Sequence, residues 1–116
     1  MTFDSDLHSY DQFLGGRLTV AQPKTGYRAG VDPVLLAASV PAGRGESVLE
    51  LGCGVGVASL CLAARVPGLE ITGVEIQPDA AILAAQNAQH NGCKLTVITG
   101  DIASPPAALR GKIFDF

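Results

Sequence analysis

Short apolar runs alternate with amphipathic segments along most of this 116-residue chain. The runs at 48–51, 70–75 and 94–98 are rich in Val, Ile and Leu and predict β-strands. Between them, residues 57–65 and 78–90 carry apolar side chains at helical spacing and are bounded by Gly or Pro. Strands that alternate with helices predict an α/β fold. We expect a Rossmann-like, doubly wound, mainly parallel sheet with helices on both faces.

The N-terminal part of the chain is less regular. Residues 1–13 show no clear periodicity, so we expect a flexible lead-in, with the folded domain spanning 14–116. The pair Gly15-Gly16 indicates a turn, and residues 17–22 alternate enough to form a strand that could belong to a hairpin.

Two further elements complete the predicted order. Asp32 is placed to be the N-cap of a short helix, with Pro33 in its first turn. Residues 112–116 predict the start of a fourth strand. Right-handed crossovers then give the spatial order 94–98, 70–75, 48–51, 112–116, with the ligand at the carboxyl ends of the strands.

Three glycines at alternate positions follow the strand at 48–51, namely Gly52, Gly54 and Gly56. A strand, a glycine turn and a helix form the first half of a nucleotide-binding unit, in which a ligand lies against the main chain and the helix N-terminus. The structural alternative is an ordinary glycine turn.

The chemistry of the ligand is indicated by Glu50, two residues before the first glycine. A dinucleotide fingerprint places its last glycine one residue later, where this chain has Val57, and usually carries an apolar residue in place of Glu50. A carboxylate suits a cation better than a pyrophosphate. S-adenosylmethionine carries an ammonium and a sulfonium and no phosphate, so it is the favoured ligand, and a nucleotide-dependent dehydrogenase is the alternative.

Three other segments reach the same edge of the predicted sheet. Glu75 could bind the hydroxyls of a ribose, or be a solvated carboxylate. Asp101 could accept a hydrogen bond from an adenine amino group, or cap a turn. Arg28 could bind the methionine carboxylate or, with Arg17 and Lys24, contact substrate phosphates, or belong to a solvated basic loop.

Composition narrows the function classes. Eight Lys and Arg residues against eleven Asp and Glu give a net charge of -3, which argues against a broad nucleic-acid-binding surface. The three cysteines lack the spacing of a zinc site or disulfide framework, and no transmembrane stretch is present, so we expect a cytoplasmic protein without a resident metal.

The segment from Gln22 to Leu36, which contains Tyr-Arg-Ala-Gly-Val-Asp, and the loop from Glu50 to Gly56 together resemble the class I SAM-dependent methyltransferases of the small-domain type. Within them, the tRNA(Val) adenine-N6 methyltransferase group is the most similar. The resemblance implies S-adenosylmethionine as methyl donor and tRNA as substrate. It also implies an Asn-Pro-Pro-Tyr acceptor motif after the fourth strand, and the sequence ends at Phe116, before any such motif.

No catalytic residue is therefore nominated. A catalytically incomplete SAM-binding fragment or module, and methyltransferases with a protein-glutamine or rRNA-guanine acceptor, stay open. We also expect self-association through the exposed edge of the fourth strand. The residues assigned to the cofactor are Tyr27, Arg28, Ala29, Gly30, Glu50, Leu51, Gly52, Cys53, Gly54, Gly56, Glu75, Ile76, Asp101 and Ile102.

Overall fold

A computed structural model describes residues 7–26 and 28–116. A parallel sheet of three strands lies at its centre, in the order β3-β4-β5. The bounds are β3 Ser47–Leu51, β4 Glu70–Glu75 and β5 Leu95–Thr99. The strands predicted at 48–51, 70–75 and 94–98 and their relative order are confirmed to within a residue or two at the ends.

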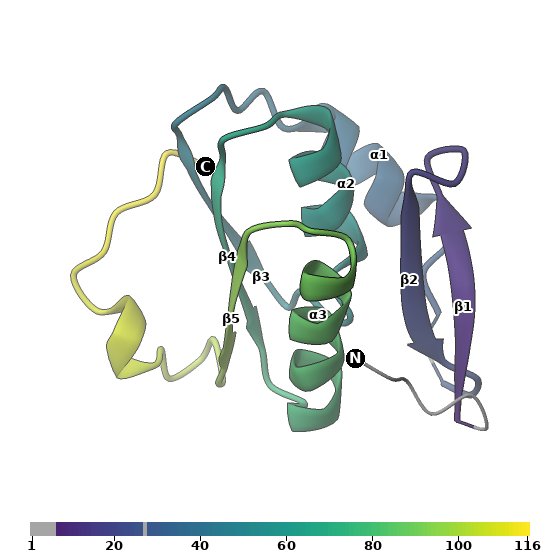
Figure 1. Cartoon of the computed structure of the whole chain (residues 1–116). Coiled ribbons are helices and arrows are strands. Elements are labelled where there is room, and N and C mark those ends of the chain that lie inside the picture. Colours follow the sequence, from purple (N-terminus) through teal and green to yellow (C-terminus); the bar gives the residue numbers. More distant parts are fainter. Residues whose placement is uncertain (1–6, 27) are drawn as a thin grey trace.

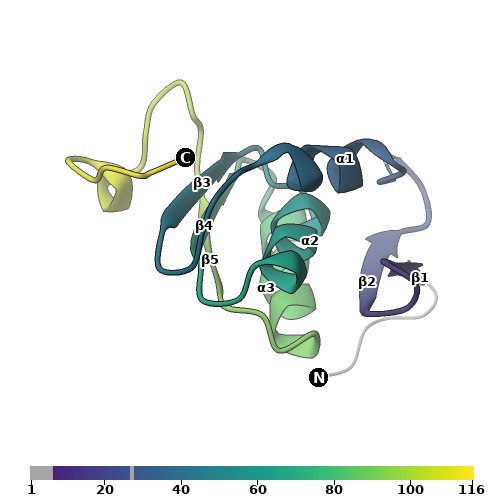
Figure 2. The same cartoon turned by 90° about the horizontal axis from the view of Figure 1, so that it is seen from above.

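Two helices connect these strands, α2 (Val57–Arg65) and α3 (Pro78–His90), as the sequence predicts. Both lie on the same side of the sheet, and α1 (Asp32–Ser39) packs on α2 (Figures 1 and 2). The two right-handed crossovers step in the same direction along the sheet, so they place their helices on one face. In the described residues the expected cover of helices on both faces is thus present on one face only.

An antiparallel hairpin lies outside the helix layer. It is formed by β1 (His8–Phe13) and β2 (Leu18–Pro23), paired from His8–Pro23 to Phe13–Leu18. Figures 1 and 2 show α2 and α3 between this hairpin and the parallel sheet. The predicted hairpin is confirmed, whereas the expectation of a flexible lead-in was wrong for residues 8–13. Polar side chains dominate β1, so its strand character comes from backbone pairing with β2 and leaves no apolar alternation in the sequence.

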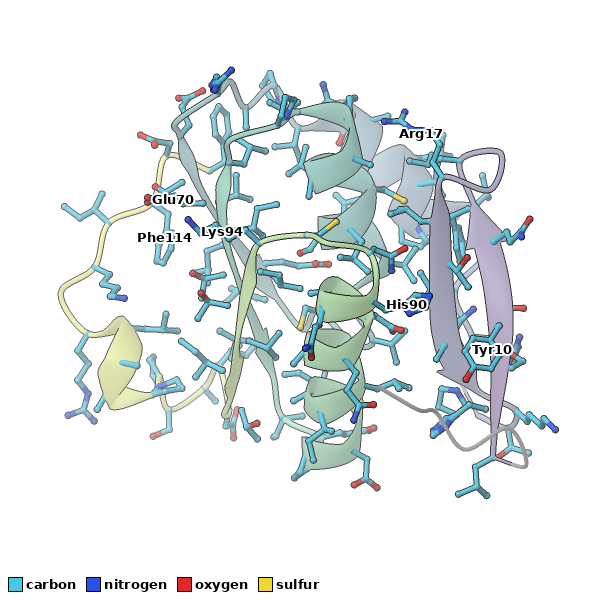
Figure 3. All side chains as sticks on the ribbon, viewed as in Figure 1. Tyr10, Arg17, Glu70, His90, Lys94 and Phe114 are labelled. Atoms are coloured by element: carbon cyan, nitrogen blue, oxygen red, sulfur yellow. The ribbon has the colours of Figure 1, made fainter. Side chains whose placement is uncertain are left out.

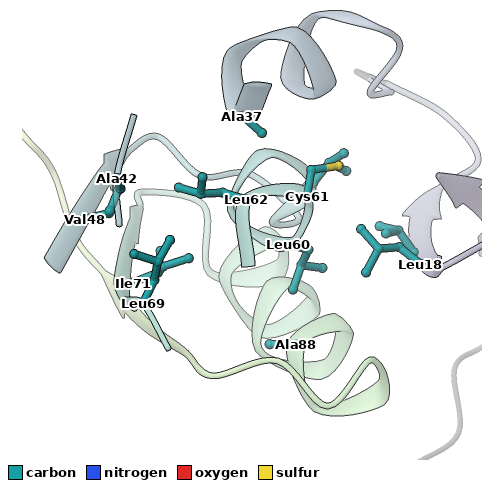
Figure 4. Close-up of a cluster of buried hydrophobic side chains, with 12 residues drawn as sticks. Leu18, Ala37, Ala42, Val48, Leu60, Cys61, Leu62, Leu69, Ile71 and Ala88 are labelled. Carbon is teal, nitrogen blue, oxygen red and sulfur yellow. The ribbon is translucent and has the colours of Figure 1, made fainter. Parts of the chain in front are cut away.

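The apolar core fills the space between the sheet, the helices and the hairpin (Figure 4). Leu60 on α2 lies at its centre with no exposed surface, and β2 reaches it through Leu18 and Val20. The core residues drawn and labelled in Figure 4 are Leu18, Ala37, Ala42, Val48, Leu60, Cys61, Leu62, Leu69, Ile71 and Ala88. The core therefore joins all three layers.

Asn87 of α3 and Asn91, the C-cap of that helix, also hold the hairpin in place. Asn87, which is fully buried, accepts a hydrogen bond from the Ala21 N–H at 2.9 Å and donates to the Ala21 carbonyl at 3.1 Å. One turn later, Asn91 makes the same pair of bonds with Thr19, at 3.0 and 2.8 Å. The second edge of β2 is thereby paired with side-chain amides in place of a third strand.

Two local predictions need correction. The N-cap of α1 is Val31, with no side-chain cap, and Asp32 is the first helical residue. Residues 112–116 do not form an assigned strand, although the Leu49 N–H donates to the Phe116 carbonyl at 3.0 Å beside β3. This position is the one expected for the fourth strand, but too few bonds form for a ladder. The preceding segment, with η1 (Ala107–Leu109), lies on the side of the sheet opposite the helices (Figures 1 and 2).

Candidate functional site

The glycine turn is fixed by backbone conformation and by bonds to β4. Gly52, Gly54 and Gly56 all have left-handed φ angles, of 73°, 56° and 96°, which side chains other than glycine rarely adopt. The N–H groups of Gly52 and Cys53 both donate to the Val74 carbonyl, at 2.7 and 3.0 Å. Gly56 is the N-cap of α2, so the loop leads directly into the free N–H groups of that helix.

Glu75, at the end of β4, braces this loop. One carboxylate oxygen accepts the Gly54 N–H and the other accepts the Gln77 N–H, both at 2.9 Å. The side chain is 9% exposed. A carboxylate has lone pairs for about four hydrogen bonds, so both oxygens keep acceptor capacity for a ribose. That role stays a prediction, and the structural role is to hold the loop against β4.

Glu50, at the end of β3, accepts a 2.6 Å hydrogen bond from the Ser59 hydroxyl on α2. Burial raises the pKa of the Glu50 carboxyl, and the hydroxyl and backbone N–H of Ser59 act in the opposite direction. Glu50 is therefore a partly desolvated carboxylate whose charge is supported from the first turn of α2.

Cys53 is buried beneath the loop. A Cβ atom on Gly73 would come within 2.8 Å of its sulfur, so the loop packs directly on the backbone of β4. Burial, and then the charges of Glu50 and Glu75, raise the pKa of the Cys53 thiol to about 12. Cys53 is a neutral packing residue of the loop at physiological pH.

A pocket of about 590 Å³ opens in front of the glycine turn. Its walls come from the end of β2 and the loop after it, from α1, from Glu50 of β3, from the glycine turn and the start of α2, and from Gln77 after β4. Among the described lining residues, the charged side chains are Asp32 and Glu50, and both are carboxylates. The size is in the range of small-molecule sites, and the negative lining favours a cationic ligand.

Five of the residues predicted to bind a cofactor line this pocket. They are Ala29, Glu50, Gly52, Cys53 and Gly54. Tyr27 lies outside the described residues. The other lining residues were not assigned to a ligand from the sequence, and they include the polar side chains of Gln22 and Asp32.

Arg28 does not line the pocket. Its guanidinium forms an ion pair with Asp11 of β1, at 2.7 Å, and donates to the Pro23 carbonyl at 2.6 Å. Gln22 donates to the same Asp11 oxygen at 2.9 Å and accepts the Ala29 N–H at 2.7 Å. These bonds tie the pocket wall to the hairpin, a role for Asp11 that no sequence motif indicated.

The three cations predicted to form a basic cluster, Arg17, Lys24 and Arg28, do not lie together. Arg17 donates to the Ala64 carbonyl at 2.8 Å, near the end of α2 that is remote from the glycine turn (Figure 3). Lys24 and Arg28 belong to the loop after β2, at the other end of that strand. The three cations therefore do not form one phosphate-binding patch, because the length of β2 separates them.

The residues predicted near an adenine lie outside the pocket. Ile76 and Ile102 are more than half exposed, at 59% and 54%. Asp101 is exposed and accepts the Ala103 N–H at 2.9 Å, so it caps its own turn. Gly30, Leu51, Gly56, Arg28 and Glu75 complete the set of predicted residues that do not line the pocket.

Two broader features also concern function. Within residues 7–26 and 28–116, no three His, Cys, Asp or Glu side chains come together as a metal site would require. None of the helices described here combines the length and apolarity needed to cross a bilayer.

Comparison with solved structures places the fold among known enzymes. P. horikoshii TYW2, solved in complex with MeSAdo, superposes with a TM-score of 0.71 over 90% of this chain and 40% of that protein, at 16% identity. The SAM-dependent methyltransferase from Agrobacterium tumefaciens gives a TM-score of 0.63 at 26% identity, over 82% of this chain and 33% of its own. The Rossmann-like, mainly parallel fold is thereby confirmed.

Sequence comparison gives closer relatives. The tRNA1(Val) (adenine(37)-N6)-methyltransferase of Proteus mirabilis is 42% identical over 73 residues, which are 62% of this chain and 29% of that enzyme. The enzyme of the same name from a Flavobacteriaceae bacterium is 41% identical over 61% of this chain and 31% of its own length. The chain thus spans less than a third of these relatives, and the resemblance to this group is confirmed.

The methyltransferase domain family matches residues 48–116, from the strand before the glycine turn to the last residue. The match includes the three glycines, Glu50, Ser59 and Glu75, so it covers the loop and both carboxylates described above. This chain therefore belongs to the methyltransferase domain family.

Proposed function

We propose that this chain is the cofactor-binding part of a SAM-dependent N-methyltransferase that modifies an adenine N6 in tRNA. S-adenosylmethionine supplies an electrophilic methyl group when bound. The chain's own residues provide the site for that cofactor. We also propose that the protein works in the cytoplasm, where its tRNA substrate would be found.

The observation that carries the cofactor assignment is the charge of the pocket. Its charged lining residues in the described part of the chain are two carboxylates, Asp32 and Glu50. A pyrophosphate would meet repulsion from both, whereas an ammonium or sulfonium group is attracted. This difference favours S-adenosylmethionine over a dinucleotide, although both would use the glycine turn.

The residues present fit such a cofactor. The left-handed glycines allow a ligand to approach the backbone, and the pocket of about 590 Å³ has room for the amino-acid end of the cofactor beside Glu50. In this proposal Glu50 faces the cationic end of the ligand and Glu75 faces the ribose. Ile76, Asp101 and Ile102 follow β4 and β5 on the exposed side of the loop, where the adenine would lie.

The acceptor assignment rests on the names of the relatives and is the finer part of the proposal. Relatives at 41–43% identity are named tRNA1(Val) (adenine(37)-N6)-methyltransferases. An amino group reacts only when it is positioned in line with the methyl group, which requires an unpaired or flipped adenine. A protein-glutamine or rRNA-guanine acceptor is the alternative to be tested.

Isothermal titration with S-adenosylmethionine, its demethylated product S-adenosylhomocysteine, and NADH tests the cofactor. We expect both adenosyl ligands to bind and NADH not to bind. Glu50→Gln should weaken the binding of both by about tenfold to a hundredfold, since it removes a charged hydrogen-bond acceptor. The matched control is Glu70→Gln, an exposed carboxylate at the start of β4, which should leave binding unchanged. Binding of NADH but not of the adenosyl ligands would overturn the assignment.

Methyl transfer from labelled S-adenosylmethionine tests the acceptor. The protein that carries this sequence is incubated separately with unmodified tRNA, rRNA and protein substrates. We expect label on an adenine N6 in tRNA. Label on guanine or glutamine would replace the proposed acceptor, and cofactor binding without any transfer would indicate a binding module.

A further inference from the structure

Ser59 is a buried polar residue that the sequence motifs do not explain. It is 3% exposed and lies three residues after Gly56, the N-cap of α2. Its hydroxyl donates a 2.6 Å hydrogen bond to the Glu50 carboxylate on β3. Short hydrogen bonds to a charged acceptor are among the stronger ones in proteins, so this contact fixes the side chain of Glu50.

The N-terminus of α2 lacks the usual capping group. Gly56 has no side chain to cap the helix, and the first turn carries no acidic residue of its own. Glu50 supplies the missing negative charge from the neighbouring strand, through Ser59. A carboxylate near a helix N-terminus is stabilised by the helix dipole.

The other ionisable groups around Glu50 do not stabilise its ionised form. Asp32 of α1 lines the same pocket, and Cys53 and Glu75 lie in the glycine loop and at the end of β4. On the pocket walls, β2 contributes Gln22 and α2 contributes Val57 and Ala58, none of which is charged. Burial raises the pKa of Glu50, and Ser59 provides the effects that lower it.

We propose that Ser59 is a positioning residue for the cofactor: its hydroxyl holds the Glu50 carboxylate against the N-terminus of α2 and keeps a negative charge facing the pocket. The carboxylate can accept about four hydrogen bonds, so the contact with Ser59 leaves acceptor capacity for the ammonium of the ligand. This assignment rests on the proposed function.

The hydroxyl should therefore control the pH dependence of binding. An ionised Glu50 attracts a cation, so affinity is full above the pKa of Glu50 in the free protein and is lost as the pH falls through it. Ser59→Ala removes a group that lowers this pKa, so the loss should begin at higher pH. A shift of about one pH unit corresponds to about tenfold weaker binding within the affected range.

Three variants separate positioning from packing. Ser59→Ala removes the hydroxyl, Ser59→Cys keeps the volume with a weak donor, and Ser59→Thr restores a hydroxyl donor. The matched control is Cys61→Ala, which trims another buried side chain of α2 that is not among the groups that shift the pKa of Glu50. We expect Ser59→Thr to retain the wild-type profile and Ser59→Cys to behave like Ser59→Ala.

The first measurement needs no ligand. Carbon-detected NMR titration of the Glu50 carboxyl gives its pKa in the wild type and in each variant. We expect a higher pKa in Ser59→Ala and Ser59→Cys, and the wild-type pKa in Ser59→Thr and Cys61→Ala. An unchanged pKa in both Ser59→Ala and Ser59→Cys would overturn the inference.

The second measurement compares two ligands across the pH range. S-adenosylhomocysteine carries the ammonium group, and 5′-methylthioadenosine lacks it. In Ser59→Ala the acid limb of S-adenosylhomocysteine binding should move to higher pH, while 5′-methylthioadenosine affinity stays unchanged. Equal weakening of both ligands would mean that Ser59 serves only packing, and would overturn the inference. Failure of the wild type to bind S-adenosylhomocysteine would instead refute the proposed function, and the NMR result would still decide the role of Ser59 toward Glu50.

Discussion

The parallel sheet and the hairpin contact the same helices from opposite sides, but different interactions hold them there. Val48 and Ile71 of the sheet share the apolar core with α2, and the hydrogen bond from Ser59 to Glu50 also joins α2 to β3. The hairpin also contributes Leu18 to the core, yet its second edge is bonded to the asparagine pair, Asn87 and Asn91. Apolar packing is tolerant of small shifts, whereas amide bonds to a backbone edge specify one position and one register.

The largest effect should come from breaking the asparagine pair. Asn87→Ala leaves the N–H and carbonyl of Ala21, and the Val55 carbonyl, without the partners that Asn87 provides. Each buried unsatisfied group costs about 1–3 kcal/mol, so we expect a loss of about 3 kcal/mol or more in the free energy of unfolding. Urea denaturation followed by circular dichroism measures it.

Gln89 is the matched control for that experiment, because it is an exposed amide on the same helix. Gln89→Ala should change the free energy of unfolding by no more than about 0.5 kcal/mol. A loss below about 1 kcal/mol for Asn87→Ala would mean that apolar contacts alone hold the hairpin, and that the two sides of the helix layer do not differ.

A smaller effect is expected on the sheet side, where packing is the main interaction. Gly73→Ala places a Cβ 2.8 Å from the Cys53 sulfur and 2.9 Å from its Cβ, so the loop must move away from β4. Overpacking of this kind costs about 1–3 kcal/mol, and we expect about 2 kcal/mol by denaturation. A double-mutant cycle combines Gly73→Ala with Cys53→Gly, which removes both clashing atoms. A coupling energy near zero between the two changes would contradict the contact.

The sequence predicted the sheet side of the molecule far better than the hairpin side. Apolar runs and the Gly and Pro boundaries gave α2, α3 and the strand order β5-β4-β3. They failed for β1, where Asp11 and Gln12 sit in a strand that is held by backbone pairing. No local pattern distinguishes Asn87 from a solvent-exposed asparagine, because its partners in β2 are 66 residues away.

The Asp11–Arg28 ion pair should matter less than either contact above. It joins the pocket wall to β1, but both side chains are about one third exposed, so solvent screens the charges. Asp11→Asn should lower the free energy of unfolding by about 0.5–1 kcal/mol, and the difference should shrink in about 1 M salt. A cost that is the same at low and high salt would show that hydrogen bonding, and not charge, makes the contact.

The smallest expected effect has the opposite sign and concerns Glu50. Burial raises its pKa above the model-compound value, so the folded state binds the proton more tightly than the unfolded state does. Stability then falls as the pH rises from the unfolded pKa through the folded pKa. Glu50→Gln does not titrate, so its free energy of unfolding should exceed that of the wild type at about pH 8, and the gain should shrink at about pH 4. A gain that does not depend on pH would contradict the burial of a charge.

The candidate site likewise combines residues that local sequence patterns indicated with residues that only the fold brings together. Sequence reasoning selected Glu50, Gly52 and Gly54, which line the pocket, because they lie at fixed spacing in one short stretch at the end of a strand. Their role toward a cofactor stays a prediction. It assigned Arg28 to a ligand carboxylate, whereas the guanidinium is bonded to Asp11, which is 17 residues earlier in the chain. Asp32 was not predicted as a pocket residue and Ser59 was not predicted as the partner of Glu50, because both roles depend on which elements meet around the pocket.

The position of α2 between the sheet, α1 and the hairpin leaves six consecutive residues, Val57 to Leu62, without a solvent-facing side. Such a helix cannot loosen unless one of the outer layers separates from it, so its central amide protons should exchange with deuterium only through global unfolding. The amides of its first turn differ, because they lie at the pocket. Slowed deuterium uptake confined to that turn would therefore report ligand occupancy directly.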